Sequence, residues 1–261
     1  AALLIALAMR AQGEAVFVRD GSGRAGMAAG LLFAIEFVLI GEGLRHTSAS
    51  HMVVFLYTAP VFAALGLHAT LPSERLAPLQ WAGIALAFAG ILVAFLMRGG
   101  VSSTSGSNVL LGDALALAAG IAWGATTVII RNSVLARASA KRTLLYQLVG
   151  ACLLALLVAL MSGQWGWRVT PMSLASMTFQ TFVVAFASYL AWFWLMRRYL
   201  ASRLGVFTFM TPLFGVAFGV TLLGETLEPS FLAGAAMVLA GVVMVSGYDW
   251  VRKPAPTRLS A

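Results

Sequence analysis

The sequence is poor in charged residues. Only 10% of its 261 residues are Asp, Glu, Lys or Arg, whereas 61% are hydrophobic. A soluble domain carries roughly 25% charged residues, and the mean hydropathy of +0.92 also lies on the apolar side. This composition excludes an ordinary soluble protein and favours one whose surface faces lipid.

Residues that build catalytic and metal centres are also scarce. Cys152 is the single cysteine, so neither an intramolecular disulfide nor a cysteine-based metal site can form. The chain has no HExxH, G-x-S-x-G or P-loop motif. We therefore expect no enzyme activity, no metal and no cofactor. The sequence also shows no ATPase domain that would supply free energy from ATP hydrolysis.

Long apolar windows, by contrast, occur along the whole chain. A helix needs about 20 apolar residues to cross about 30 Å of hydrocarbon, and strict alternation typical of a membrane β-barrel is absent. The sequence therefore predicts an all-α membrane protein. Residues 1–9 are apolar but too short to span, and eight windows are long enough: 25–44, 49–69, 77–97, 110–130, 143–161, 176–196, 203–223 and 230–247.

One pattern occurs twice, in residues 45–97 and 197–247. Arg, Ala-Ser, Pro, Glu, Leu and two Ala-Gly pairs recur in the same order, about 151 residues apart. In the first copy they are Arg45, Ala49-Ser50, Pro60, Glu74, Leu76, Ala82-Gly83 and Ala89-Gly90; in the second, Arg197, Ala201-Ser202, Pro212, Glu225, Leu227, Ala233-Gly234 and Ala240-Gly241. A duplicated membrane protein is typical of transporters whose site lies between the halves.

The loops that connect the windows differ in charge. The loops on one face and the C-terminal tail carry 14 Lys and Arg residues, and the loops on the other face carry only Arg45, Arg98 and Arg168. Cytoplasmic loops are the basic ones, so this face and the C-terminus are predicted to be cytoplasmic. Topology then accounts for the net charge of +8, and we expect no nucleic-acid partner.

Matching the repeats leaves window 110–130 without a counterpart. We therefore expect one further helix ahead of residue 1, which gives ten helices as two inverted repeats of five. The first repeat covers residues 1–100, a linker covers 101–109, the second repeat covers 110–248, and a cytoplasmic tail covers 249–261. The alternative for residues 1–9 is a cleavable signal peptide, but no basic segment precedes them.

The repeated residues resemble the EamA-type drug/metabolite transporter superfamily. The resemblance rests on 44–50 (LRHTSAS), 57–60 (YTAP), 73–76 (SERL) and the Ala-Gly pairs, on their second copies Thr211-Pro212-Leu213 and Gly224-Glu225-Thr226-Leu227, and on Gly112-Asp113. It implies ten helices, inverted repeats and solute export across the inner membrane. Within the family the chain is similar to amino-acid exporters, including those for aromatic amino acids. The alternatives are a multidrug or other metabolite exporter and, third, a channel.

Pro60 and Pro212 lie near the middle of windows 49–69 and 203–223. Each removes one helical hydrogen bond and predicts a kink, which is either a hinge for alternating access or a static bend. The paired glycines of windows 77–97 and 230–247 predict close helix packing. Gly215 and Gly219 form a further G-x-x-x-G pair, read as an internal helix contact or a dimer face. Glu74 and Glu225 are interpreted as caps of helix starts.

Ionisable groups at bilayer depth are candidates for the solute pathway. Glu36 lies near the centre of window 25–44, and its repeat counterpart is Ser188. Glu36 is predicted to bind a substrate ammonium or to carry a proton, with a structural carboxyl as the alternative. His51 is the second candidate, against a hydrogen-bonded packing residue.

Aromatic residues gather in the same windows. Tyr57 and its repeat counterpart Phe209 belong to this group, and Trp123, Tyr189 and Trp192 lie too deep for an interfacial belt. They predict an apolar and aromatic cavity suited to amino acids, with core packing as the alternative. The sequence thus predicts a multi-pass inner-membrane carrier, which we expect to be a monomer, that exports amino acids or related small metabolites by alternating access.

Overall fold

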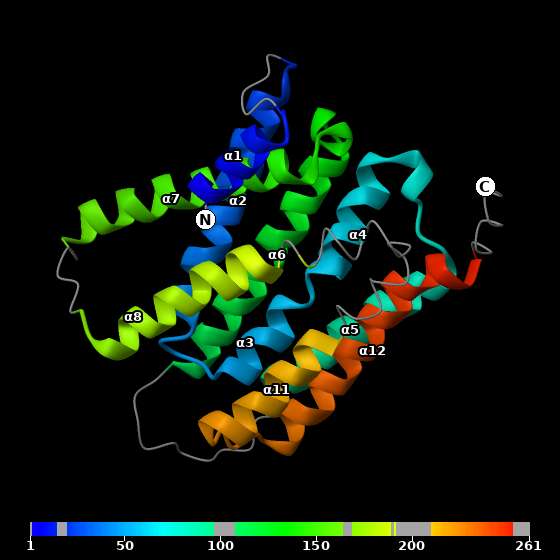
Figure 1. The fold of residues 1–261 in the computed structure, drawn as a ribbon. Helices are drawn as coiled ribbons and strands as arrows, with labels where there is room; N and C mark the ends of the chain where they lie inside the picture. The colour runs from blue at the N-terminus through cyan, green and yellow to red at the C-terminus, as the bar shows by residue number, and fades with distance from the viewer. Residues whose placement is uncertain are drawn as a thin grey trace. The chain divides into compact units, whose positions relative to one another are not determined.

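The computed structural model describes residues 2–14, 20–96, 108–163, 169–188, 191 and 210–252. Every regular element in these ranges is helical (Figure 1), which confirms the predicted all-α class. The chain divides into two compact units. Unit 1 comprises residues 1–35 and 129–207, and unit 2 comprises residues 36–128 and 208–261. Each unit draws on both halves of the sequence, so the division into repeats 1–100 and 110–248 stays a prediction about the duplication.

Five described helical spans are long and apolar enough to cross a membrane. They are α2 (Ser22–Gly43), the pair α3 (Ala49–Leu56) and α4 (Ala59–Thr70), α6 (Val109–Arg131), α7 (Ala140–Ser162) and α12 (Pro229–Arg252). The other apolar helices are α1 (Ala2–Ala11), α5 (Pro78–Leu96) and α11 (Met210–Leu223). Two short 3-10 helices, η1 (Pro72–Glu74) and η2 (Val134–Arg137), lie in connections.

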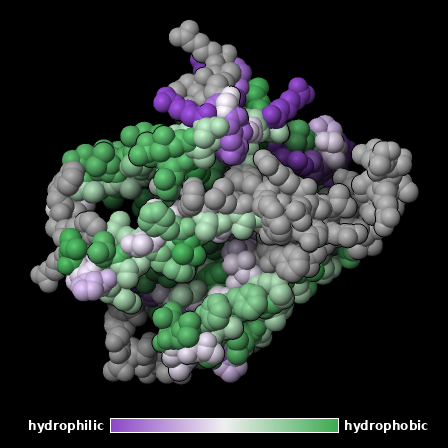
Figure 2. Space-filling model, in the orientation of Figure 1, coloured by the Kyte–Doolittle hydropathy of each residue, from purple (hydrophilic) through white to green (hydrophobic). Residues whose placement is uncertain are grey.

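Large apolar side chains cover the outer surfaces of the helices. Leu153 and Met161 of α7, Met172 of α8 (Pro171–Thr178) and Leu222 of α11 are each more than half exposed. Figure 2 shows the apolar colouring continuing along the helices on the visible face. In water the exposure of these side chains would cost free energy, because each Å² of apolar area removed from water stabilises a protein by about 25 cal/mol. These surfaces fit the hydrocarbon of a bilayer.

In unit 1, helix α7 packs against α1 and the first part of α2. Met9 of α1 is fully buried, and it forms a small core with Ile5 and Leu144. A Cβ built on Gly150 of α7 would lie 2.5 Å from the carbonyl carbon and oxygen of Gly30 of α2, and one built on Gly30 would lie 2.6 Å from the carbonyl oxygen of Tyr146 of α7. Glycine at both positions therefore allows this contact between the two backbones.

The helix predicted over residues 176–196 begins five residues earlier in the structure, at Pro171. Helix α8 (Pro171–Thr178) starts at a capping box, in which Thr170 and Ser173 each bind the other's backbone, with Pro171 at the first helical position. Hydropathy did not reveal this polar start. From Phe179 to Ala187 the chain continues as η3, a π-helix, where the sequence predicts an α-helix. Residues 189–190 and 192–209 lie outside the described part.

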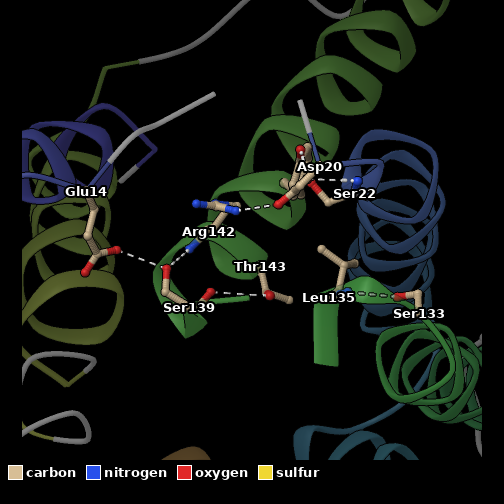
Figure 3. Close-up of polar contacts among 9 residues, drawn as sticks. Glu14, Asp20, Ser22, Ser133, Leu135, Ser139, Arg142 and Thr143 are labelled. Atoms are coloured by element: carbon tan, nitrogen blue, oxygen red, sulfur yellow. Dashed lines mark hydrogen bonds and ion pairs between the residues drawn. The ribbon is translucent and has the colours of Figure 1, made fainter. Parts of the chain in front are cut away.

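A polar cluster in unit 1 ties the loop before α2 to the start of α7 (Figure 3). Lys141 Nζ lies 2.6 Å from Glu14 Oε1, and Arg142 Nη1 lies 2.8 Å from Asp20 Oδ2. The hydrogen bond from Lys141 lowers the pKa of Glu14 below its ordinary value. These ion pairs join the loop before α2 to the first turn of α7, in agreement with the predicted assignment of these two segments to one face of the membrane.

In unit 2, helices α5 and α12 lie side by side and cross through their glycines (Figure 1). A Cβ built on Gly90 would lie 2.6 Å from the carbonyl oxygen of Gly234, and one built on Gly83 would lie 2.9 Å from that of Gly241. A backbone atom cannot rotate out of the way as a side chain can. The predicted packing role of the four glycines is therefore confirmed.

The same contacts reveal how the two repeats are related. In the duplicated sequence Gly83 corresponds to Gly234, and Gly90 corresponds to Gly241. If each glycine of the Gly83–Gly241 contact is replaced by its counterpart in the other repeat, the result is the Gly234–Gly90 contact. The structure contains both contacts. Two antiparallel helices related in this way have a half-turn axis between them. This is the local symmetry expected of inverted repeats.

Carboxylate and hydroxyl groups cap the start of α3. Glu225, in the loop between α11 and α12, accepts hydrogen bonds from the backbone N–H of Ala49 at 2.7 Å and of Ser50 at 3.0 Å. Ser48 Oγ accepts from the N–H of His51. Three N–H groups that no helical carbonyl can satisfy are thus paired. The capping role predicted for Glu225 is confirmed, and the helix it caps belongs to the other repeat.

Glycine-to-alanine changes test the α5–α12 crossing. We expect Gly90→Ala and Gly241→Ala each to lower the free energy of unfolding by about 1–3 kcal/mol, because overpacking against backbone forces the helices apart. Thermal unfolding in detergent measures the effect. Gly41→Ala in α2 is the matched control, since a Cβ there meets nothing within 4 Å. Equal melting temperatures for all three variants would contradict the close crossing.

Acid titration tests the Glu225 cap. Partial burial raises the pKa of the Glu225 carboxyl, but hydrogen bonds from Ser50 and Ala49 outweigh it, so the pKa lies below its ordinary value of 4.5. The cap therefore stabilises the fold above about pH 4.5, and the contribution is lost as pH falls through the folded-state pKa. We expect Glu225→Gln to cost about 0.5–2 kcal/mol at pH 7.

The difference in melting temperature between wild type and Glu225→Gln is expected to shrink in acid. Glu228→Gln, in the same loop, is the matched control. A difference that stays constant from pH 7 to pH 3 would show that the cap does not depend on ionised Glu225.

Candidate functional site

The first element of the candidate site is a break in the span formed by α3 and α4. Helix α3 ends at Leu56 and α4 begins at Ala59. Pro60 has no N–H, so the helical ladder cannot pass this point unbroken. The hydroxyl of Thr58 donates to the carbonyl oxygen of Phe55 at 2.6 Å and takes over part of the interrupted bonding. The interruption predicted at Pro60 is present, and its role as a hinge stays a prediction.

Helix α6 lies directly against this break. A Cβ built on Gly120 would lie 2.8 Å from Thr58 Oγ1, and one built on Gly124 would lie 2.9 Å from the carbonyl oxygen of Ala59. Both positions therefore require glycine for α6 to reach the backbone of α3 and α4. Trp123 lies between these two glycines in the sequence, so it is carried on the part of α6 that meets the break.

Aromatic side chains meet at the break. The rings of Tyr57 and Trp123 are 5.4 Å apart and nearly perpendicular, at 88°, an edge-to-face arrangement that aromatic pairs favour. Thr211 of α11 forms a hydrogen bond with Tyr57. Both rings are half-buried. The structure thus brings together two of the predicted substrate-binding residues and one threonine from a third helix.

Glu36 is the second element of the site. Its side chain is buried, with 6% of the residue exposed. The Oε2 atom is fully enclosed and has no hydrogen-bond partner in the described part of the chain. Burying a carboxyl group without a partner is costly. Such a group in a membrane span is a candidate for the solute pathway, and the role of Glu36 in substrate binding or proton transfer stays a prediction.

The face of α2 that carries Glu36 is turned toward α3 and α6. Glu36, Ile40 and Gly43 follow one another at intervals of four and three residues, which places them on one face of the helix. A Cβ built on Gly43 would lie 2.6 Å from Met52 of α3 and 3.3 Å from the carbonyl oxygen of Gly112 of α6. Ile40 packs against the core that includes Met52.

Glu36 also lies level with the break. The contact between Gly43 and Gly112 fixes the register of α2 against α6. Seven residues along α2 from Gly43 to Glu36 correspond to a rise of about 10 Å. A rise of about 10 Å along α6, from Gly112 toward its C-terminal end, leads to the helical turn that contains Gly120. Gly120 is the residue that contacts Thr58 at the break. The carboxyl and the break are therefore at one depth in unit 2.

His51 belongs to a separate polar group at the start of α3. Its Nδ1 lies 3.0 Å from Asp113 Oδ2, and its ring stacks on Phe231 at 3.7 Å. The hydroxyl of Thr47 donates to Asp113 Oδ1 at 2.5 Å. Asp113 is fully buried. His51 is thus held by a carboxylate and an aromatic ring, and its role in substrate binding stays a prediction.

The structure gives less information about the other residues that the sequence predicts to bind substrate or to form hinges. Ser188 lies in unit 1, where it is exposed and its hydroxyl donates to the carbonyl of Val184. Its predicted position opposite Glu36 stays a prediction, as does the role of Pro212, which is buried near the described start of α11. Tyr189, Trp192 and Phe209 lie outside the described residues.

Sequence reasoning missed two features of the site. Asp113 was noted only as part of a family pattern, although an aspartate in the first turns of an apolar window is a signal in its own right. The Thr58 bond to Phe55 was also missed, because it depends on the broken helix. Within the described ranges no group of three or more His, Cys, Asp or Glu is close enough to hold a metal ion.

Comparisons with known proteins agree with this architecture. The model of the EamA-like transporter family matches residues 1–96 and 110–247. The chain is 29% identical to a probable amino-acid metabolite efflux pump of Salmonella typhimurium strain LT2, over 80% of this chain and 70% of the relative. It is 27% identical to a protein of the same description from Escherichia coli K12, over 84% of this chain and 73% of the relative.

More distant relatives show the same class. An uncharacterized transporter of Archaeoglobus fulgidus is 25% identical over 83% of this chain and 72% of the relative. One solved crystal structure has the same fold, with a TM-score of 0.60 and 22% identity, over 97% of this chain and 85% of that chain. The family match extends over both halves of the chain, and the resemblance inferred from the repeated residues is confirmed. This protein is therefore a member of the EamA-like transporter family.

Proposed function

We propose that this protein exports amino acids, including aromatic ones, or related small amphipathic metabolites, by alternating access across the inner membrane. Its family consists of membrane transporters, and two relatives are described as probable amino-acid metabolite efflux pumps. The proposal places the C-terminus in the cytoplasm and assigns no enzyme activity. The small molecule would bind in unit 2 at the level of the helix break.

One observation carries the proposal: an unpartnered buried carboxyl is level with an aromatic pair. An amino acid has a cationic ammonium group and, in the aromatic case, a flat apolar side chain. Glu36 offers the carboxylate for the first, and Tyr57 and Trp123 offer ring faces and edges for the second. Polar groups that fix orientation inside an apolar pocket are typical of small-molecule sites.

The break in the α3–α4 span supports a conformational role for the same place. A helix that continues through Pro60 would need a hydrogen bond that proline cannot give. The two half-helices are therefore free to change their relative direction with little loss of bonding. Such discontinuous helices recur at the substrate sites of transporters with inverted repeats. Alternating access would use this break as its hinge, with the counterpart at Pro212.

Transport in proteoliposomes tests the function. A panel of radiolabelled amino acids is expected to show saturable flux, strongest for aromatic substrates. Trp123→Ala is expected to raise KM for aromatic amino acids about three- to tenfold, the equivalent of losing roughly 0.5–1.5 kcal/mol of aromatic contact. Trp81→Ala is the matched control, since Trp81 of α5 contacts His68 and lies away from the break. Conductance at rates far above carrier turnover would instead identify a channel.

The pH dependence of flux tests Glu36. We expect Glu36→Gln to flatten the dependence of flux on pH, because the amide does not exchange a proton in this range. Glu42→Gln is the matched control on the same helix, where Glu42 is exposed and paired with Arg45 at 3.0 Å. An unchanged pH profile for Glu36→Gln, with normal expression, would remove Glu36 from the transport cycle.

A further inference from the structure

The sequence of unit 1 contains many basic side chains but two acidic ones, Glu14 and Asp20. Both carboxylates are already paired. Glu14 Oε1 lies 2.6 Å from Lys141 Nζ, and Asp20 Oδ2 lies 2.8 Å from Arg142 Nη1, a pair that Figure 3 shows. The sequence of unit 1 therefore holds no further carboxylate that could neutralise its other basic side chains.

Three of these other side chains are exposed arginines at helix ends. Arg10 lies in the last turn of α1, Arg24 lies in the first turn of α2, and Arg137 is the last residue of η2. All three are exposed, and in the ranges that the structure describes none of them forms an ion pair. Their positive charges are therefore available to a partner from outside the chain.

Contacts within unit 1 bring two of these arginines to the start of α7. Arg10 lies two residues before Gln12, whose side-chain oxygen accepts a hydrogen bond from Lys141 Nζ. Arg137 lies four residues before Lys141, in the connection that leads into α7. Both arginines are thus within a few residues of the same lysine.

Arg24 lies at the same end of unit 1. The hydroxyl oxygens of Ser22 and Tyr146 are 3.1 Å apart, and this hydrogen bond joins the first turn of α2 to the second turn of α7. Arg24 follows Ser22 by two residues and therefore belongs to the same end of the helices. We call Arg10, Arg24 and Arg137 the arginine patch.

The arginine patch continues into exposed apolar faces. On α1 and on α2, two large apolar side chains share a helical face with the arginine, at intervals of three and four residues. They are Leu7 and Leu3 for Arg10, and Met27 and Leu31 for Arg24, and all are more than half exposed. Each face thus has a cationic end and an apolar length, which complements a molecule with an anionic group on an apolar chain.

The third arginine is held in place by a buried neighbour. Leu135 of η2 is 2% exposed and anchors this short helix, whereas Val134 is 49% exposed. Val134 and Arg137 are three residues apart, so they lie on the same side of a 3-10 helix. The exposed side of η2 therefore also combines an apolar side chain with a guanidinium group.

We propose that the arginine patch binds the phosphate groups of anionic phospholipids, whose acyl chains lie along the exposed faces of α1 and α2. Guanidinium groups donate paired hydrogen bonds to phosphate oxygens. Snorkelling explains why long basic side chains lie at helix ends, but it does not supply their counter-charge. The patch lies on the predicted cytoplasmic face, where anionic lipids attract basic segments. This surface is distinct from the solute site and does not depend on the identity of the solute.

Lipid binding to the purified full chain in detergent tests the patch. The probes are phosphatidylglycerol and phosphatidylcholine with identical oleoyl chains, which differ in charge because choline neutralises its phosphate, and glycerol 3-phosphate, which has no acyl chain. Ligand-induced thermal stabilisation measures the affinities. We expect wild type to bind phosphatidylglycerol about tenfold or more tightly than either other probe, and high salt to reduce this preference.

Removal of the three charges tests the residues. We expect Arg10→Gln, Arg24→Gln and Arg137→Gln together to weaken phosphatidylglycerol binding about thirtyfold, and each alone about three- to fivefold. Phosphatidylcholine binding is expected to stay unchanged. Arg45→Gln is the matched control, since Arg45 is an exposed arginine of unit 2 that is already paired with Glu42 at 3.0 Å. The single variants give the same test if the triple variant does not fold.

Several outcomes would overturn the proposal. The first is equal phosphatidylglycerol binding by wild type and the triple variant, and the second is equal binding of the two phospholipids by wild type. Glycerol 3-phosphate that binds as tightly as phosphatidylglycerol would identify a site for a soluble anion instead. Tighter binding of a polyglutamate peptide than of phosphatidylglycerol would identify a surface for an acidic protein.

Discussion

The structure depends on the need of every backbone N–H and C=O group in hydrocarbon to find a partner within the protein. An unbroken helix meets this need by itself, so each interruption requires a local substitute. At the break between α3 and α4, Thr58 supplies a side-chain hydroxyl and a backbone N–H to Phe55. At the start of α3, Glu225 and Ser48 pair three further N–H groups. The short helix α3 is thus defined at both ends by named side chains.

Close packing without large side chains holds unit 2 together around this helix. Glycines allow α5 to cross α12, and glycines on α6 allow it to reach the backbone at the break. In lipid there is no hydrophobic force between helices, so dispersion contacts at short range and hydrogen bonds must supply the attraction. The symmetric contacts Gly83–Gly241 and Gly90–Gly234 show that equivalent residues of the two sequence repeats also pack in equivalent ways.

The two buried carboxyl groups of unit 2 have different surroundings. Asp113 accepts hydrogen bonds from Thr47 and His51 and is a satisfied member of a network. Glu36 has an enclosed oxygen without a partner. A satisfied buried network stabilises one arrangement, whereas an unsatisfied group costs free energy unless something else repays it. This contrast is why the proposed site is centred on Glu36, whereas a role of His51 in substrate binding stays a prediction.

Much of this was determined by the sequence alone. Windows of about 20 apolar residues fix helices because lipid leaves the backbone no other choice, and the repeated glycines, prolines and glutamates predicted the duplication, the break at Pro60 and the cap formed by Glu225. Local pattern carries this information because hydropathy and backbone chemistry act over a few residues. Only the tertiary structure decided which partners meet: that Tyr57 touches Trp123, that Asp113 holds His51, and that Glu36 keeps an oxygen unpaired. Those facts depend on the register between helices far apart in the chain, which packing sets and no single helix contains.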